Sequence, residues 1–139
     1  MSIQEYYDFA MKNSYDFKSD EEIERKFWRS LGNNGGMVDP IYGADIPGSL
    51  FGDFPSAWNV NKLNNKLQLL FDSMDGVNTA MLYFGSWRAM FAYHVEDMNL
   101  FSINYLHTGA PKYWCFIPVS YQHRFENFAQ SHFKSDFYN

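Results

Sequence analysis

Apolar residues recur with a helical period in two stretches of the first half of the chain. Ser19 stands three residues before Glu22, which is the spacing of a capping box, and Gly32 follows the last apolar position. The pattern predicts a short amphipathic helix between Ser19 and Gly32. Leucine and phenylalanine recur at helical spacing over 63–71 and predict a second helix there, whereas 1–18 shows only weak helical periodicity.

Beyond residue 79 the pattern changes to short runs of residues that favour strands. The predicted strands are 81–84, 90–93, 100–106 and 113–119. Gly109 and Pro111 suit a turn, so residues 100–119 are predicted to form a hairpin.

A last helix is predicted after Ser120, which could cap it, because Phe125, Phe128 and Ala129 then share one face. Loops are expected at 33–36 and from Asp39 to Pro55. Helices followed by consecutive strands indicate an α+β fold with helices packed outside a sandwich or barrel. Four strands are too few to close a barrel, so the chain is expected to form half of one.

Composition narrows the class of protein. The chain has 139 residues, 20% of them aromatic, a net charge of −5 and no basic run. These features argue against direct binding of nucleic acid but are compatible with a basic peptide as partner. Cys115 is the single cysteine, so no internal disulfide can form. No apolar run is long enough for a membrane span, so a soluble, intracellular protein is expected.

The candidate chemistry centres on His94 and Glu96, which are two residues apart in an aromatic-rich run. In an extended conformation their side chains project to the same face. An imidazole and a carboxylate with open coordination positions are ligands of non-heme Fe(II) oxygenases, which a second histidine completes. A three-residue match is common by chance, and the alternative is an ordinary strand with a hydrogen-bonded histidine and a solvated glutamate.

Two further residues favour the oxygenase interpretation. If the predicted hairpin has an odd-numbered loop, Asn104 lies opposite Trp114, Lys112 lies opposite Leu106, and all four share a face. A lysine that faces a barrel interior needs an anion, which a dicarboxylate co-substrate would supply. Alternatively, Lys112 lies at the mouth of the hairpin and remains in water.

Other candidate residues have ordinary interpretations as well. Tyr42 and Tyr83 could be packing residues, and Gly76 could simply end a helix. None of the remaining histidines follows a strand that would return to the metal. These are His107, His123 and His132.

Several strings in this order resemble the JmjC-domain histone lysine demethylases, specifically the subfamily that acts on trimethylated lysines nine and thirty-six of histone H3. The resemblance runs from about Asp20 to Phe133, and its most specific block is 94–114. The matching strings are Pro40-Ile-Tyr-Gly-Ala-Asp45, Gly76-Val-Asn-Thr79, Leu82-Tyr-Phe-Gly85, His94-Val-Glu-Asp-Met-Asn-Leu100, Ser102-Ile-Asn-Tyr-Leu-His107 and Pro111-Lys-Tyr-Trp114.

The resemblance implies roles for individual residues. His94 and Glu96 correspond to two of the three Fe(II) ligands. The positions that correspond to the 2-oxoglutarate site are Tyr42, Asn104, Lys112 and Trp114. Those that correspond to the methyl-ammonium pocket, whose oxygens accept weak hydrogen bonds from polarised C–H groups, are Gly76, Tyr83 and Glu96. Asp45 and Asp75 correspond to the groove for the basic histone tail.

The implied fold is a double-stranded β-helix, the jelly-roll barrel of cupins, of which this chain would hold part. Residues 1–35 are expected to be a helical linker segment and 36–139 an incomplete JmjC catalytic domain. The family's third iron ligand and its structural zinc site, which Cys115 alone cannot form, are expected beyond residue 139. The isolated chain is therefore expected to be poorly stable and to show little or no turnover.

The implied activity is Fe(II)- and 2-oxoglutarate-dependent hydroxylation of an N-methyl group, which releases formaldehyde from a methylated histone H3 tail in the nucleus. Two alternatives stay open: a JmjC protein hydroxylase with a stable product, and a non-catalytic module that binds histone tails. The preferred lysine, its methylation state, the oligomeric state and whether the termini are genuine are not determined by the sequence.

Overall fold

The computed structural model describes residues 1–32, 37–53, 55–70 and 72–133. It divides into two compact units, Met1–Tyr105 and Leu106–Asn139. The predicted boundary between residues 35 and 36, and the predicted loop at 33–36, lie outside the described residues. None of the described helices combines the length and the apolar character that a membrane span requires.

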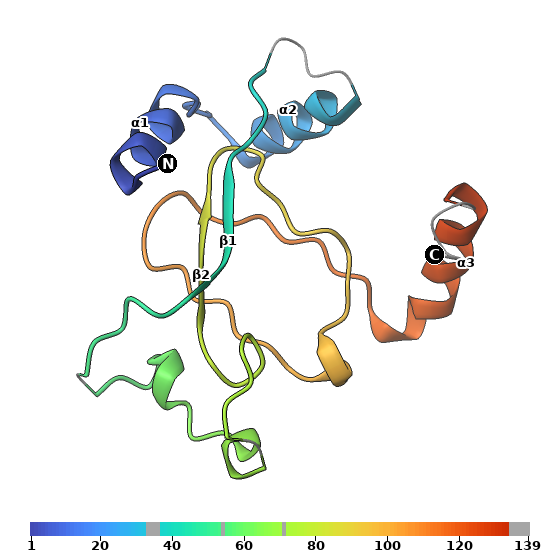
Figure 1. The fold of residues 1–139 in the computed structure, drawn as a ribbon. Coiled ribbons are helices and arrows are strands. Elements are labelled where there is room, and N and C mark those ends of the chain that lie inside the picture. The colour runs from blue at the N-terminus through green and yellow to red at the C-terminus, as the bar shows by residue number, and fades with distance from the viewer. Residues whose placement is uncertain (33–36, 54, 71, 134–139) are drawn as a thin grey trace. The chain divides into compact units, whose positions relative to one another are not determined.

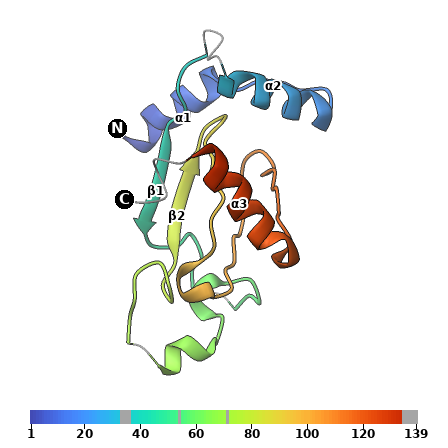
Figure 2. The ribbon, with the colours of Figure 1, turned by 90° about the vertical axis from the view of Figure 1, so that its right-hand side faces the viewer.

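The first unit is organised on a two-stranded antiparallel sheet, β1 (Tyr42–Pro47) and β2 (Met81–Gly85). Figures 1 and 2 show the two strands side by side from both directions. The β2 strand confirms the prediction at 81–84, whereas β1 replaces part of a predicted loop. The pairing Gly43↔Phe84 changes to Ile46↔Leu82, so β1 carries one extra residue and the sheet has a bulge.

Two helices lie near the end of the sheet where β1 begins (Figures 1 and 2): α1 (Ile3–Lys12) and α2 (Asp20–Gly32). The second confirms the predicted helix, and the Ser19 hydroxyl accepts a hydrogen bond from the backbone N–H of Glu22. The first helix is missing from the prediction, although Ser2 and Glu5 form a complete capping box at its start. That spacing was the signal by which α1 could have been found.

Aromatic side chains connect this end of the sheet to the helices. The ring of Tyr6 on α1 lies 6.2 Å from that of Phe84 on β2. Trp87 lies 4.8 Å from Phe17 and 6.5 Å from Phe27, measured between ring centroids. Edge and tilted ring contacts of this kind contribute beyond their buried area. The short segment after β2 thus contacts both the α1–α2 connection and α2.

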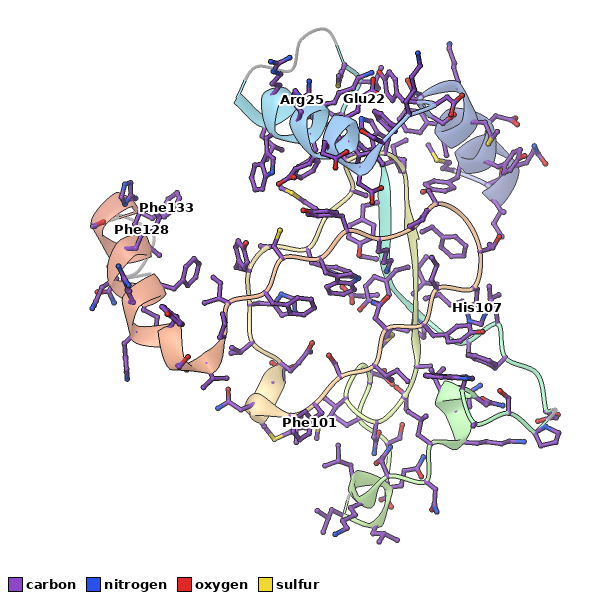
Figure 3. The ribbon with its side chains drawn as sticks, turned by 180° about the vertical axis from the view of Figure 1, so that it is seen from behind. Glu22, Arg25, Phe101, His107, Phe128 and Phe133 are labelled. Carbon is purple, nitrogen blue, oxygen red and sulfur yellow. The ribbon has the colours of Figure 1, made fainter. Side chains whose placement is uncertain are left out.

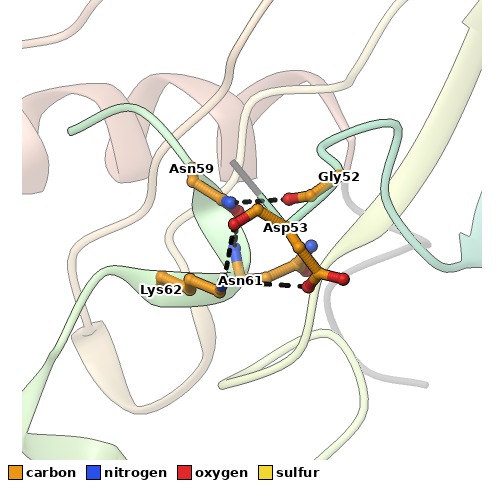
Figure 4. Close-up of polar contacts among 5 residues, drawn as sticks. All are labelled: Gly52, Asp53, Asn59, Asn61 and Lys62. Atoms are coloured by element: carbon orange, nitrogen blue, oxygen red, sulfur yellow. Dashed lines mark hydrogen bonds and ion pairs between the residues drawn. The ribbon is translucent and has the colours of Figure 1, made fainter. Parts of the chain in front are cut away.

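The loop after β1 is organised by Asn59, which is fully buried (Figure 4). Its amide nitrogen donates to the carbonyl of Gly52 over 3.1 Å, and its amide oxygen accepts from the backbone N–H of Asn61 over 3.0 Å. The ammonium of Lys62 donates to the carbonyl of Asp53. A buried amide side chain with its bonds satisfied replaces a hydrophobic core in this loop.

The predicted helix at 63–71 is wrong over its described residues. Within 63–70 the only helical element is the short 3₁₀ turn η2 (Lys66–Leu69); a similar turn, η1 (Val60–Lys62), precedes it, and Asn64 between the two has a φ of 50°. Asparagine favours this left-handed conformation, and Asn65 then caps the second turn by accepting from the N–H of Gln68. Local asparagine chemistry therefore interrupts the helical period of the leucines. Phe71 lies outside the described residues.

The predicted strands at 90–93, 100–106 and 113–119 are also wrong, because residues 86–118 form no strand. A turn follows β2, with Arg88 at a φ of 72°, and the 3₁₀ turn η3 (Asp97–Asn99) contains two more positive φ values. Gly109 has a φ of 104°, in keeping with the predicted turn, but no paired strands flank it. Apolar, β-favouring sequence forms a strand only where a partner strand pairs with it.

In the second unit, the 3₁₀ turn η4 (Val119–Tyr121) leads into α3 (Gln122–His132). The helix confirms the prediction, and Ala129 lies buried on its predicted apolar face. The predicted cap is wrong, because Ser120 lies inside η4 and Tyr121 holds the cap position without a side-chain bond. Figure 3 shows Phe128 on this helix and Phe133 directly after it.

Burial of apolar side chains is sparse throughout the described chain. Ala129 is its only buried apolar residue, while Phe101, which follows η3, is fully exposed (Figure 3). The polar residues Ser30, Asn59, Ser86 and Arg88 are buried. The described structure is an α+β arrangement with one small sheet in place of the four strands expected from the sequence.

Candidate functional site

The two strands bring together three of the predicted site residues. Tyr42 begins β1, Asp45 lies in its bulge, and Tyr83 occupies the middle of β2. The Tyr83 hydroxyl donates a hydrogen bond of 2.5 Å to a carboxylate oxygen of Asp45. The rings of Tyr42 and Tyr83 lie 6.1 Å apart. Tyr83 is 41 positions from Tyr42 and 38 from Asp45 in the sequence, and the antiparallel pairing makes it their neighbour.

Both tyrosines are held in the neutral form over the physiological range. Burial raises the pKa of Tyr42 to about 12, with a further contribution from the charge of Asp45. The hydrogen bond to Asp45 is the largest cause that raises the pKa of Tyr83 to about 12, followed by burial and by the charges of Asp45 and Glu96. Neutral phenols keep their protons and can act as hydrogen-bond donors.

Phe91 joins these tyrosines to the candidate metal ligand. Its ring lies 5.5 Å from those of both Tyr42 and Tyr83, and 6.2 Å from the imidazole of His94. Sequence reasoning assigned Phe91 to a strand and gave it no place in the site. Its position three residues before His94 was the available signal. The aromatic contacts place the imidazole next to the sheet without a strand at 90–93.

The imidazole of His94 has a defined orientation. Its Nδ1 lies 2.8 Å from the carbonyl oxygen of Ala92. Because a carbonyl only accepts hydrogen bonds, Nδ1 carries the proton, and the lone pair of the neutral ring is on Nε2. Nε2 faces a carboxylate oxygen of Glu96 at 3.8 Å, and both side chains are about half exposed. Metal-binding histidines commonly have this arrangement, with the second nitrogen bonded to a carbonyl.

The pair can be tested against the requirements of a metal ion. Two neighbouring ligands of an octahedral ion lie roughly 3 Å apart, given metal–ligand bonds of about 2.1 Å. The observed distance of 3.8 Å between Nε2 of His94 and the Glu96 carboxylate is within about 1 Å of that spacing. The donor set therefore fits two positions of an Fe(II) site. No group of three or more His, Cys, Asp or Glu side chains suited to a metal occurs among the described residues.

The remaining predicted site residues of the first unit lie in the turn before β2 and near the end of the unit. Gly76 has a φ of 74° in a turn before β2, so it does not end a helix as one interpretation had it. Its N–H donates to the hydroxyl of Thr79, which in turn contacts the carboxylate of Asp75 over 3.4 Å. A side chain on Gly76 would meet Met81 at the start of β2. Asn104 lies in exposed chain near the end of the unit.

Lys112 and Trp114 belong to the second unit. Partial burial lowers the pKa of Lys112 below its usual value. The ring of Trp114 stacks on Phe116 at 6.0 Å with an interplanar angle of 13°. The predicted pairing of Asn104 with Trp114 and of Lys112 with Leu106 is wrong as a strand register, because neither arm of the hairpin forms a strand.

Comparison with known proteins shows which family the chain is similar to. The family described as "JmjC domain, hydroxylase" matches residues 81–138, which include His94, Glu96 and Lys112. Over residues 81–138 the chain is similar to the JmjC family. This confirms the resemblance that the motifs indicated.

Three relatives that the chain resembles are named lysine-specific demethylases. The mouse protein lysine-specific demethylase 4B is 42% identical over 139 residues, which covers 93% of this chain and 12% of the relative. The human probable lysine-specific demethylase 4F is 45% identical over 116 residues, 81% of this chain and 18% of the relative. The rat lysine-specific demethylase 4D is 41% identical over 143 residues, 96% of this chain and 27% of the relative. The chain thus spans between about an eighth and about a quarter of these relatives' length.

Proposed function

We propose that this chain contributes to an Fe(II)- and 2-oxoglutarate-dependent demethylase of methylated lysines on the histone H3 tail, with lysines nine and thirty-six, the sites of the subfamily that it resembles, as the candidate substrates. The observation that carries the proposal is the orientation of His94, whose protonated Nδ1 leaves Nε2 free beside Glu96. The names of the relatives, all lysine-specific demethylases, support the reaction. A histone substrate implies a nuclear protein.

His94 and Glu96 would hold the iron, with a third ligand from outside the described residues. Iron, when bound with 2-oxoglutarate, supplies the oxidising chemistry that hydroxylates an N-methyl group and leads to loss of formaldehyde. The carbonyl of Ala92 holds the proton of the neutral imidazole on Nδ1 of His94, so that Nε2 would be the nitrogen that binds a metal. The ring of Phe91 lies beside the imidazole.

The co-substrate would be held by a neutral phenol and a cation. Tyr42 keeps its proton because its pKa is about 12, so it can donate to the distal carboxylate of 2-oxoglutarate. Lys112 is partly removed from water, which makes an anionic partner favourable for its ammonium. Asn104 and Trp114 complete the proposed co-substrate set. Zinc is proposed only for the longer proteins of this family.

The methylated lysine would be surrounded by oxygens of Gly76, Tyr83 and Glu96, with Asp45 and Asp75 toward the basic tail. Tyr83 and Glu96 are coupled, since the charge of Glu96 is one of the causes that raise the pKa of Tyr83. Oxygen acceptors near a methylated ammonium make weak C–H···O contacts, which bind the cation without an N–H donor.

Binding of Mn(II) as a redox-inert substitute for Fe(II) tests the proposal. We expect Mn(II) to bind weakly, to bind more tightly when 2-oxoglutarate is added, and to favour a trimethylated H3 peptide over the unmethylated peptide. Paramagnetic relaxation of water protons by Mn(II) reports the first two effects, because the co-substrate displaces coordinated water. Co-substrate binding that ignores the metal would contradict the proposal.

Product analysis separates the proposed demethylase from a JmjC hydroxylase. The second activity is considered because the matching family is described as a hydroxylase. A demethylase releases formaldehyde, whereas a hydroxylase leaves a stable product that has gained one oxygen atom. We expect little turnover by the 139-residue chain alone, because two side-chain ligands hold iron less tightly than three. Substantial formaldehyde release by this chain would show that the low-turnover expectation is wrong while supporting the reaction.

A further inference from the structure

The extra residue of β1 lies directly opposite Tyr83. The pairs on either side are Gly43↔Phe84 and Ile46↔Leu82, so Ala44 and Asp45 together face the single residue Tyr83. A bulge of this kind re-aims a side chain of the longer strand. Asp45 has a φ of 53°, a left-handed conformation that aspartate adopts more readily than most residues. The bulge therefore brings a carboxylate to the Tyr83 hydroxyl.

We propose that Asp45 is a positioning residue that fixes the Tyr83 hydroxyl for recognition of the methylated lysine. This inference rests on the function proposed above and deepens it. An ionised carboxylate can only accept hydrogen bonds, so the phenol is the donor in the bond between Tyr83 and Asp45. Its only proton then points at Asp45, and the remaining lone pairs of the oxygen are free to accept.

The direction of that proton matters to a methylated ammonium. A trimethylated lysine has no N–H group and presents only polarised C–H groups, which need oxygen acceptors. A phenol that rotated its proton toward the cation would present its positive end instead. A hydrogen bond donated to an anion also increases the electron density on the donor oxygen, because neighbouring hydrogen bonds polarise one another. Asp45 thus makes Tyr83 a better acceptor.

This role differs from that of a simple acidic residue in a groove for a basic tail. An anion that attracts the tail by charge would strengthen binding of methylated and unmethylated peptides alike, with a strong dependence on salt. A residue that positions Tyr83 would affect only the preference for the methylated lysine. Its effect would also disappear when the Tyr83 hydroxyl is removed. The two roles therefore predict different results for the same variants.

The first experiment measures the Asp45–Tyr83 bond without any ligand. Tyrosine ionisation is followed by ultraviolet absorbance, and the curve of Tyr83 is the difference between the wild-type chain and Tyr83→Phe. We expect Tyr83 to titrate near 12 in the wild type and closer to the ordinary value of 10 in Asp45→Gly. Glycine accepts the φ of 53° without strain, so the backbone of the bulge is kept. Asp72→Asn, which removes an exposed charge elsewhere, should leave the curve unchanged.

The second experiment compares affinities for trimethylated and unmethylated H3 peptides, with Mn(II) and 2-oxoglutarate present. We expect Asp45→Gly to reduce the ratio of the two affinities by roughly three- to tenfold, the scale of one hydrogen bond. Asp45→Asn should restore part of the ratio, because the amide oxygen can still accept. Asp45→Gly combined with Tyr83→Phe should lower the ratio no further than Tyr83→Phe alone.

If the pKa of Tyr83 were unchanged in Asp45→Gly, the hydrogen bond between Asp45 and Tyr83 would be ruled out, and the inference would be overturned. If Asp45→Gly weakened binding of the trimethylated and unmethylated peptides equally, and this loss added to that of Tyr83→Phe, the inference would be overturned in favour of simple charge attraction. If the wild-type chain binds the two peptides equally, the proposed function is what fails, and the lysine-recognition role of Asp45 fails with it. The titration still decides independently whether Asp45 holds the Tyr83 hydroxyl.

Discussion

Two histidine–carboxylate pairs of similar spacing occur in different surroundings. His94 and Glu96 lie 3.8 Å apart, and His123 and Glu126 on α3 lie 3.6 Å apart. The first imidazole has its Nδ1 bonded to a carbonyl and packs beside Phe91. The second directs its Nδ1 at the carboxylate itself, and its side chain is 97% exposed.

The comparison shows that distance alone does not define a candidate metal ligand. A pair on a helix surface forms because residues three apart in the chain are neighbours there. The pair at residues 94 and 96 has a fixed proton position and a packed ring, which reduce the cost of ordering the ligands before a metal binds. The surroundings, and not the two residue types, distinguish the sites.

The largest expected effect separates the two pairs by their affinity for metal. His94→Ala should weaken Mn(II) binding by at least about tenfold, because a direct ligand contributes no less than the outer-shell groups whose loss costs 10–100-fold. His123→Ala is the matched control and should leave the affinity unchanged. Calorimetric titration of both variants against the wild type measures the difference. Equal losses in the two variants would remove the distinction between the pairs.

A smaller effect is expected when the packing around His94 is removed. Phe91→Ala should lower the free energy of unfolding by about 1–2 kcal/mol, below the 3–5 kcal/mol of fully buried phenylalanines, because the ring is half exposed. Mn(II) affinity should fall several-fold as the imidazole loses its neighbour. Phe101→Ala is the control, since that ring is fully exposed, and it should change neither quantity. Urea unfolding and metal titration provide the two measurements.

The smallest expected effect concerns the carboxylates. Glu96→Gln should lower the pKa of Tyr83 slightly, by less than about one unit, because the charge of Glu96 is the last of the causes that raise it. Glu126→Gln should not change it, since that carboxylate is not among those causes. Ultraviolet titration again reports the result. A larger shift from Glu126→Gln than from Glu96→Gln would contradict the described environment of Tyr83.

The same titration has a consequence for stability. The folded pKa of Tyr83 is about 12 and lies above the ordinary value of 10. The folded state therefore binds this proton more tightly than the unfolded state does, and the contribution to stability is fully present below pH 10. It is lost as the pH rises through about 12. In Asp45→Gly this part of the alkaline loss of stability should shrink, which thermal unfolding between pH 9 and pH 12 would detect.

Capping residues were a reliable local signal for the first two helices, although only one of the two signals was used. Ser19 and Glu22 correctly predicted α2, and Ser2 and Glu5 offered the same signal for α1. The strand predictions were poorer, because only the segment 81–84 pairs with another strand. That partner, β1, contains Gly43 and Pro47 and resembles a loop in sequence. Pairing between distant segments decided which apolar runs became strands.

The sequence could predict which residues belong to the candidate site, but it could not predict how their side chains are arranged in space. Motif resemblance pointed to His94, Glu96 and Tyr83. The bond between Asp45 and Tyr83 depends on a register shift, and the ring contacts of Phe91 depend on how the chain folds back after β2; no local pattern contains either. The roles of Asn104, Lys112 and Trp114 stay predictions, to be tested through binding of the co-substrate.

By itself, the sequence determined the family, the capped helices, one strand and the residue types able to bind iron, because these depend on local spacing and on side-chain chemistry. Tertiary structure decided which side chains meet. The bulge in β1 turns Asp45 toward Tyr83, and the carbonyl of Ala92 sets the proton of His94. Hydrogen bonds require angles and distances within a few tenths of an ångström, and only the folded backbone fixes these.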